Sequence, residues 1–94
     1  MLEPSTVLRK SSSQVSCVLN EEVAVLNVEK ALYFGLQGVG AHIWDFLEAP
    51  HSVAEICEDV TAKFDVAPEV CRQDVLTFLG ALQDAGLIET APKG

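Results

Sequence analysis

The chain has 94 residues, which is the size of one domain and leaves no room for a second. Acidic residues outnumber basic ones by 14 to 6, and the formal net charge is −8. Phosphate backbones and anionic membranes repel such a chain, so its composition argues against both nucleic acid and a membrane as partners. The hydrophobic fraction of 49% is enough for one core and leaves apolar surface for a partner.

The N-terminal segment and the cysteine spacing indicate the cellular compartment. The first 14 residues lack an apolar segment of the secretory type, and no apolar run approaches the roughly 18 residues that span a bilayer. The cysteines, Cys17, Cys57 and Cys71, are odd in number and form no C-x-x-C pair, which argues against a disulfide framework or a zinc site. We therefore expect a cytoplasmic protein with small buried thiols.

The N-terminal part predicts strands. Residues 1–14 are polar and serine-rich, and we expect a flexible arm there with a short edge strand at Thr6–Arg9. Two polar turns, at residues 20–21 and 29–30, separate the apolar strands that follow, Val15–Leu19, Val23–Val28 and Ala31–Leu36. Strands joined by such short turns form an antiparallel meander.

Side-chain alternation predicts which faces of these strands are buried. On the first strand, the inward side chains are expected to be Val15, Cys17 and Leu19. The second strand, Val23–Val28, is almost continuously apolar, as in a central strand covered on both faces. On the third strand, one face should carry Leu32, Phe34 and Leu36, and the other Ala31, Tyr33 and Gly35.

Helical periodicity begins after the third strand. A first apolar stripe at helical spacing comprises Val39, Ile43, Phe46 and Leu47, and Pro50 should end that helix. Ser52 with Glu55 forms the pattern of a capping box at the start of a second helix. The stripe of this second helix is expected to contain Val53, Ile56, Cys57, Val60 and Phe64.

The third helix completes the fold. Pro68 is well placed at its first position, it should run to about Ala85, and Gly86 is a natural residue to follow its end. Strands followed by helices predict an α+β domain. We expect a winged helix-turn-helix-like arrangement in which a three-stranded antiparallel N-terminal sheet packs on three helices.

No constellation for catalysis is evident in the sequence. His42 and His51 have no spacing to the cysteines that matches a metal site or a Cys–His nucleophile. Neither a G-x-G-x-x-G motif nor a P-loop occurs. We therefore expect no enzyme activity, no metal and no cofactor.

A helix-turn-helix raises the alternative of a winged-helix DNA-binding regulator. The third helix carries one arginine, Arg72, against the acids Glu69, Asp74 and Asp84. This charge balance is wrong for contact with phosphates, so DNA binding stays the weaker hypothesis.

The third strand and the third helix suggest a groove. The segment Ala31–Leu36 contains neither a charge nor a proline, so as an edge it would be open to an added strand unless a loop or a dimer partner covers it. The buried stripe of the third helix is expected to contain Cys71, Val75, Phe78, Leu79 and Leu82. Val70 and Leu76 fall on opposite flanks of this stripe. Which flank would form the other wall of the groove is left open by the sequence.

Residues 22–89 resemble the PqqD-like family, the peptide-recognition elements of ribosomally made, modified-peptide pathways. The matching features are the hydrophobic hairpin, the run Gly40-Ala41-His42-Ile43-Trp44, the capped Ser52-Val53-Ala54-Glu55-Ile56, and the pattern Asp74-Val75-x-x-Phe78-Leu79-x-x-Leu82-x-x-x-Gly86-Leu87. The resemblance implies that a leader peptide binds as an extra antiparallel strand on the third strand, against the third helix.

Within the family, the chain looks most like the stand-alone recognition proteins of lasso-peptide pathways. That branch implies a cysteine-type leader peptidase as a further partner. The alternative within the family is a peptide chaperone for a radical SAM enzyme of pyrroloquinoline-quinone synthesis.

By position, the resemblance gives a set of expected peptide-binding residues. They are Ala31, Leu32, Tyr33, Phe34, Gly35, Val70, Asp74, Val75, Leu76 and Thr77. We expect the recognition domain to span residues 15–89, followed by a C-terminal tail at residues 90–94, and the protein to be a monomer.

Overall fold

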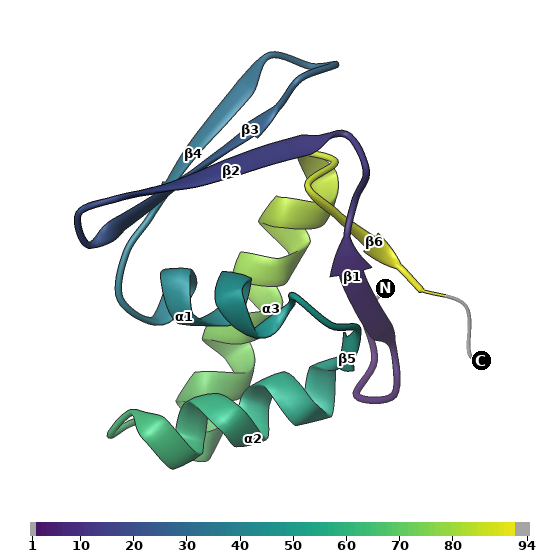
Figure 1. Ribbon diagram of the computed structural model, residues 1–94. Coiled ribbons are helices and arrows are strands. Elements are labelled where there is room, and N and C mark those ends of the chain that lie inside the picture. The colour runs from purple at the N-terminus through teal and green to yellow at the C-terminus, as the bar shows by residue number, and fades with distance from the viewer. Residues whose placement is uncertain (1, 92–94) are drawn as a thin grey trace.

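The computed structural model describes residues 2–91 and shows an α+β domain with two sheets of three strands each and three helices (Figure 1). In chain order the elements are β1 Val7–Lys10, β2 Gln14–Leu19, β3 Glu22–Asn27, β4 Leu32–Leu36, α1 Val39–Phe46, β5 His51–Ser52, α2 Val53–Lys63, α3 Pro68–Asp84 and β6 Ile88–Thr90. The predicted α+β class is confirmed, whereas the expectation of a single sheet is wrong. The winged helix-turn-helix description stays a prediction.

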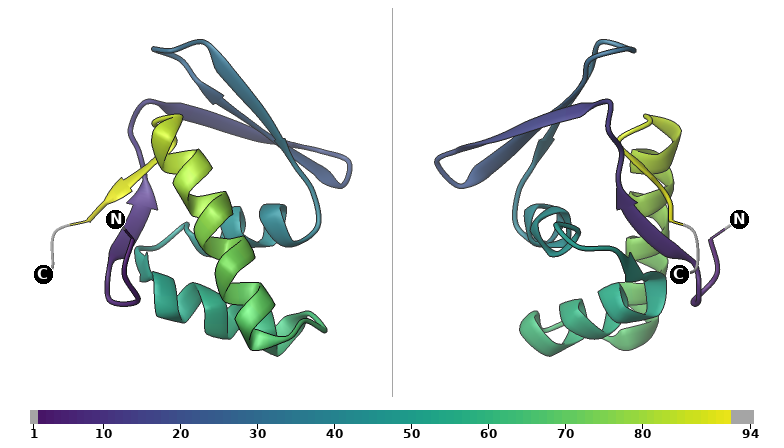
Figure 2. Two further views of the ribbon diagram at one scale, coloured as in Figure 1. Left: turned by 180° about the vertical axis from the view of Figure 1, so that it is seen from behind. Right: turned by 45° about the vertical axis from the view of Figure 1, so that its right-hand side comes forward.

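The predicted meander is the sheet β2-β3-β4, which lies across one end of the helices (Figures 1 and 2). The turn between β2 and β3 contains Asn20 at a φ of 58°, a left-handed conformation that asparagine tolerates well. This tight turn was predicted from the sequence and is confirmed.

The turn between β3 and β4 differs from the prediction because it spans residues 28–31. Asn27, 2% exposed, holds it: its Oδ1 accepts the backbone N–H groups of Glu29 and Lys30, each at 3.0 Å. Ala31 closes the turn at a φ of 54°. Ala31 is therefore a turn residue and not the first residue of the strand.

The faces of β2 and β3 also differ from the prediction. Ser16 of β2 pairs with Val25, which is fully buried, so Ser16 is on the inner face of the sheet and Val15, Cys17 and Leu19 are on the outer face. The outer face is uncovered in the described part of the chain, and Leu26 of β3 is 40% exposed. Apolar alternation alone cannot tell the covered face of a strand from a bare one.

The second sheet has the order β5-β1-β6 and corrects the prediction of a flexible arm. β1 is its central strand, paired with both neighbours, and Leu8 at its centre is fully buried. A domain boundary at residue 15 would therefore cut off part of the core. Ala91 also donates its N–H to the Val7 carbonyl at 2.8 Å, while residues 92–94 of the predicted tail lie outside the described residues.

The ends of α2 and α3 follow the local signals in the sequence, whereas α1 ends at Phe46, before the Pro50 that was expected to end it. The capping box of α2 is complete, because the Glu55 N–H bonds Ser52 Oγ at 3.1 Å and the Ser52 N–H bonds the Glu55 carboxylate at 2.8 Å. Pro68 begins α3, and Gly86 follows its end at a φ of 74°. These predictions are confirmed.

The core lies where the helices meet the two sheets. Its fully buried side chains include Leu8, Val25, Ile56, Leu79, Leu82 and Leu87. Cys71 is buried as expected, but Cys17 is exposed on the outer face and Cys57 is half-buried. No helix among residues 2–91 is long and apolar enough to cross a membrane.

Candidate functional site

The free edge of β4 is the first component of the site. β4 is an edge strand of its sheet, with β3 on one side and, within residues 2–91, no strand on the other. The Val28 N–H shows which neighbouring strand each backbone group of β3 faces. It donates to the Ser13 carbonyl at 3.0 Å and so points toward β2. Because backbone groups alternate in direction, those of Val25 and Asn27 point toward β4.

The register then assigns each backbone group of β4. Phe34 pairs with Val25, so its N–H and C=O face β3, whereas the groups of Tyr33 and Gly35 point to the free edge. Tyr33 and Gly35 are therefore the positions at which an added strand could form hydrogen bonds. The side chains of Phe34 and Leu36 face the helices instead, and Leu36 is 6% exposed.

An apolar pocket of about 250 Å³ lies between the three helices near the C-terminal end of β4. Its lining residues are Val39, Gly40, Ile43, Val60, Val66, Cys71, Asp74, Val75 and Phe78. Gly40 allows a close approach here, because a Cβ at that position would lie 3.3 Å from the Phe78 ring and 4.0 Å from the Leu36 Cβ. The pocket suits an apolar side chain, and its charged lining residue is Asp74.

The thiol of Cys71 contributes an apolar surface to this pocket. Burial raises its pKa and the nearby carboxylate of Asp74 raises it further. The thiol therefore stays protonated at neutral pH and is a poor nucleophile. Burial likewise raises the pKa of Cys57, the neighbouring thiol on α2.

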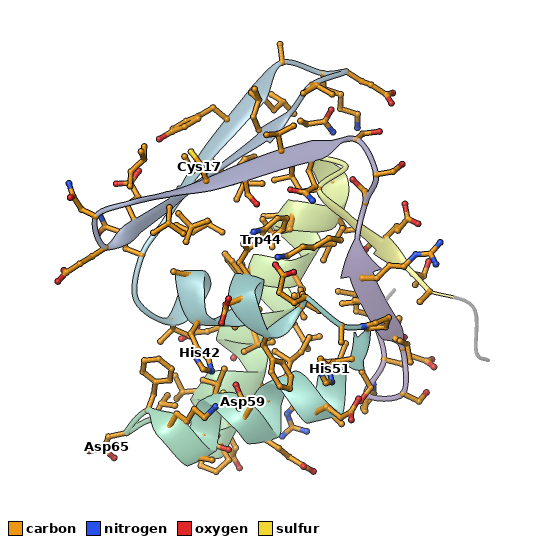
Figure 3. All side chains as sticks on the ribbon, in the orientation of Figure 1. Cys17, His42, Trp44, His51, Asp59 and Asp65 are labelled. Carbon is orange, nitrogen blue, oxygen red and sulfur yellow. The ribbon has the colours of Figure 1, made fainter. Side chains whose placement is uncertain are left out.

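The histidines have structural contacts. His42 of α1 contacts the Asp59 carboxylate of α2, and the same carboxylate pairs with Lys63 at 3.0 Å (Figure 3). His51 stacks on the Phe46 ring with a centroid distance of 3.9 Å. Among the described residues, no group of three or more His, Cys, Asp or Glu side chains is placed to hold a metal ion.

The structure separates the expected peptide-binding residues of α3 into three environments. Asp74 and Val75 line the pocket, although Val75 is only 2% exposed and belongs mainly to the core. Val70 and Thr77 are exposed. Leu76 lies on the opposite flank, in a hollow with Leu2, and so is displaced from the pocket that Asp74 lines.

The expected residues of β4 have different roles, and several pocket residues of α1 and α3 were not expected. Tyr33 and Gly35 supply the free backbone groups, Leu32 and Phe34 face the helices, and Ala31 lies outside the strand. Phe78, Val39 and Gly40 line the pocket but were not among the expected binding residues. The helical stripe placed Phe78 in the core, and the glycine next to an aromatic ring becomes meaningful only once α1 and α3 are packed together.

Comparison with known proteins identifies the family. The family described as coenzyme PQQ synthesis protein D (PqqD) matches residues 22–88. The chain belongs to the PqqD family. No curated protein sequence matches this chain significantly.

Two solved structures resemble this PqqD-family chain over almost its whole length. One, TbiB1 in complex with the TbiA(beta) leader peptide, is 32% identical with a TM-score of 0.81, covering 90% of this chain and 99% of the other. The second, lasso peptide synthetase B1 complexed with the leader peptide, is 17% identical with a TM-score of 0.71, covering 87% of this chain and 96% of the other. The second likeness shows the fold alone.

Proposed function

We propose that this protein binds the leader segment of a ribosomally made precursor peptide, of the lasso-peptide type, as an added antiparallel strand on β4. It then delivers the leader to a cysteine-type leader peptidase and performs no chemistry itself. The observation that carries the proposal is the 32% identity, over 90% of this chain, to a protein whose structure holds a leader peptide. The uncharged free edge beside an apolar pocket supports the same reading from physical grounds.

The geometry supplies both affinity and selectivity. The backbone groups of Tyr33 and Gly35 would each form ladder hydrogen bonds worth about 0.5–1.5 kcal/mol net. An apolar leader side chain buried in the pocket would add about 1.5–3 kcal/mol. After the cost of ordering a flexible leader, such contacts are consistent with binding at roughly micromolar concentration. Asp74 would favour a hydrogen-bond donor or a cation next to the apolar anchor.

The first test uses a synthetic leader peptide of a lasso-peptide precursor. Fluorescence anisotropy should report saturable binding, and mass spectrometry of the incubated mixture should recover the peptide intact. A scrambled peptide of the same composition is the control. Cleavage by this protein alone would contradict the proposed role without catalysis, and equal binding of the scrambled peptide would contradict recognition of the leader.

Two other functions remain as alternatives. A peptide chaperone for a radical SAM enzyme would use the same edge and pocket, and it would be favoured if the protein bound such an enzyme and no leader peptidase. A winged-helix DNA-binding regulator would need a basic α3, whereas α3 carries one arginine, Arg72, and three acids, Glu69, Asp74 and Asp84. Sequence-specific retardation of duplex DNA at physiological salt would favour the regulator. We further propose that the protein is a cytoplasmic monomer, which sedimentation and cell fractionation would test.

A further inference from the structure

The outer face of the β2-β3-β4 sheet, defined as the face turned away from the helices, carries an unusual concentration of exposed apolar side chains. Directly paired residues of an antiparallel sheet project to the same face. The register therefore aligns Val15, Leu26 and Tyr33 in one row across the strands. Their exposed fractions are 58%, 40% and 61%. Exposed strand positions tolerate polar side chains, so burial in the fold does not account for an apolar row here. Contiguous exposed apolar residues of this kind mark interaction surfaces.

The next row of the outer face is made of small residues. Cys17, Ala24 and Gly35 are aligned by the same register, and Figure 3 shows Cys17 on the side of the sheet away from Trp44. Beyond them, Leu19 pairs with Glu22 and is 54% exposed. Small side chains between two larger rows form a shallow apolar trough across the strands, a shape that complements an apolar ridge on another protein.

Charge at the border of the trough is negative. The Glu22 carboxylate lies over Gly35, where it accepts hydrogen bonds from the Tyr33 hydroxyl at 3.2 Å and from Gln37 Nε2 at 3.1 Å. Glu21 and Glu29 occupy the two turns of the sheet. A second copy of this chain would bring like charges together, and its net charge of −8 opposes such pairing. A partner with Lys or Arg beside its apolar ridge would be attracted.

We propose that the outer face is the docking surface for the enzyme that processes the bound leader, through an apolar ridge flanked by basic side chains. This inference rests on the proposed function. The leader would bond the edge-facing backbone groups of Tyr33 and Gly35 and fill the pocket between the helices, whereas the Tyr33 side chain projects to the outer face and Val15 lies on the opposite edge strand. The leader and the enzyme can therefore be held at the same time, which a delivery protein requires.

Val15 and Val18 provide a matched pair for the test. Both are exposed valines on β2, but the Val15 side chain is on the outer face, whereas Val18 pairs with Val23 on the inner face and is 73% exposed. Binding of the leader peptidase of the same pathway is measured by biolayer interferometry, and leader binding by anisotropy. Val15→Lys should weaken peptidase binding about tenfold or more, because it places a cation in a buried apolar contact facing basic residues. Val18→Lys should leave it unchanged, and both variants should bind the leader like the unmodified protein.

The outcomes separate this inference from the proposed function. If both lysine variants bind the peptidase as well as the unmodified protein does, the docking surface is wrong while the proposed function still stands. If the unmodified protein does not bind the peptidase at all, the docking surface and the proposed delivery are both wrong, and only leader binding stands. If sedimentation shows a dimer of the unmodified protein that Val15→Lys converts to a monomer, the outer face serves self-association and the inference is overturned. Loss of leader binding by Val15→Lys would also overturn it, because the two surfaces would then not be separate. Failure of the unmodified protein to bind the leader would instead contradict the proposed function.

Discussion

The two sheets of this protein are built from similar apolar strands but differ in what covers them. In the β5-β1-β6 sheet, Leu8 is fully buried and Ile88 is 2% exposed. In the β2-β3-β4 sheet, one edge strand is exposed along most of its length and its outer face is bare. The first sheet joins the two ends of the described chain to the helices and stabilises the fold. The second presents backbone edges and apolar surface, which are the features that bind other chains.

The largest expected effect tests the stabilising role of the first sheet. Leu8→Ala should lower the free energy of unfolding by about 2–5 kcal/mol, because it removes a fully buried leucine side chain and leaves a cavity. Urea denaturation followed by circular dichroism measures the loss. The matched control is Leu19→Ala on the outer face, which should cost about 0.5 kcal/mol or less since Leu19 is 54% exposed. An equal loss of unfolding free energy in the two variants would show that the first sheet does not stabilise the fold more than the outer face of the second.

Two proline substitutions in β4 test whether the leader adds a strand to its free edge. Phe34→Pro should destabilise the fold by about 3 kcal/mol, because the Phe34 N–H points toward β3 and proline cannot donate in the ladder. Tyr33→Pro should leave a cooperative melt but abolish leader binding, because its N–H points to the free edge. Thermal melts combined with anisotropy measure both effects.

Ser16→Pro on β2 is the control for this pair. Ser13 faces β3, so alternation directs the Ser16 N–H to the far edge of the sheet. This variant should melt like the unmodified protein and keep full leader affinity. Undiminished leader binding by a folded Tyr33→Pro variant would show that the peptide does not add a strand to β4.

Asn27 connects the exposed sheet to α3, and its removal should have an intermediate effect. Its Nδ2 donates to the Ala85 carbonyl at 2.7 Å, in addition to the two turn hydrogen bonds accepted by its Oδ1. Asn27→Ala should cost about 1–3 kcal/mol, because a buried carbonyl and two turn N–H groups lose their partner. Chemical denaturation measures this cost, and hydrogen exchange should show faster opening in β3 and β4 than in β1. Gln37→Ala is an exposed control, and a loss there as large as that of Asn27→Ala would refute the proposed connection.

The smallest expected effect concerns pH and the contact between α1 and α2 at Asp59. Burial tends to raise the pKa of Asp59, but hydrogen bonds from Lys63 and His42 outweigh it and hold that pKa below its usual value. A depressed pKa in the folded state stabilises the protein above the unfolded pKa, near pH 4, and this stabilisation is lost as the pH falls through the folded pKa. Asp59→Asn should therefore lower the melting temperature at pH 7. It should also reduce the fall in melting temperature between pH 5 and pH 2.5, which thermal melts at both pH values measure. An unchanged drop would show that Asp59 does not contribute to acid sensitivity.

Local chemistry made the start of α2, both ends of α3 and the first hairpin turn predictable. The capping box of Ser52 and Glu55, Pro68 at the start of α3 and Gly86 after its end act within a few residues, so their effect does not depend on distant packing. Asn20 determined the first turn for the same reason. The second turn was mispredicted because the Asn27 side chain, bonded to Glu29 and Lys30, holds a longer loop than the polar pair alone suggests.

For the candidate site, the sequence indicated the charge-free edge strand but not the pocket. An uncharged segment without proline identified residues 31–36 as a possible docking edge, and the register then resolved which of their backbone groups are free. The pocket depends on Gly40 of α1 lying against Phe78 of α3, two residues far apart in the chain. No periodicity within either helix could reveal that contact, and the same limitation placed Leu76 and Val70 on flanks that could not be ranked.

The sequence by itself determined the order of the main strands and helices, the start of α2, both ends of α3, the α+β class and the acidic charge, because these follow from neighbouring residues and composition. Only the tertiary structure decided that Val7–Lys10 is a central strand and that Val15, Cys17 and Leu19 lie on a bare face. The reason is that alternation in a strand specifies two faces but not what packs against either. β1 is buried because β5 and β6, far away in the sequence, pair with its two edges, and no local pattern records those partners.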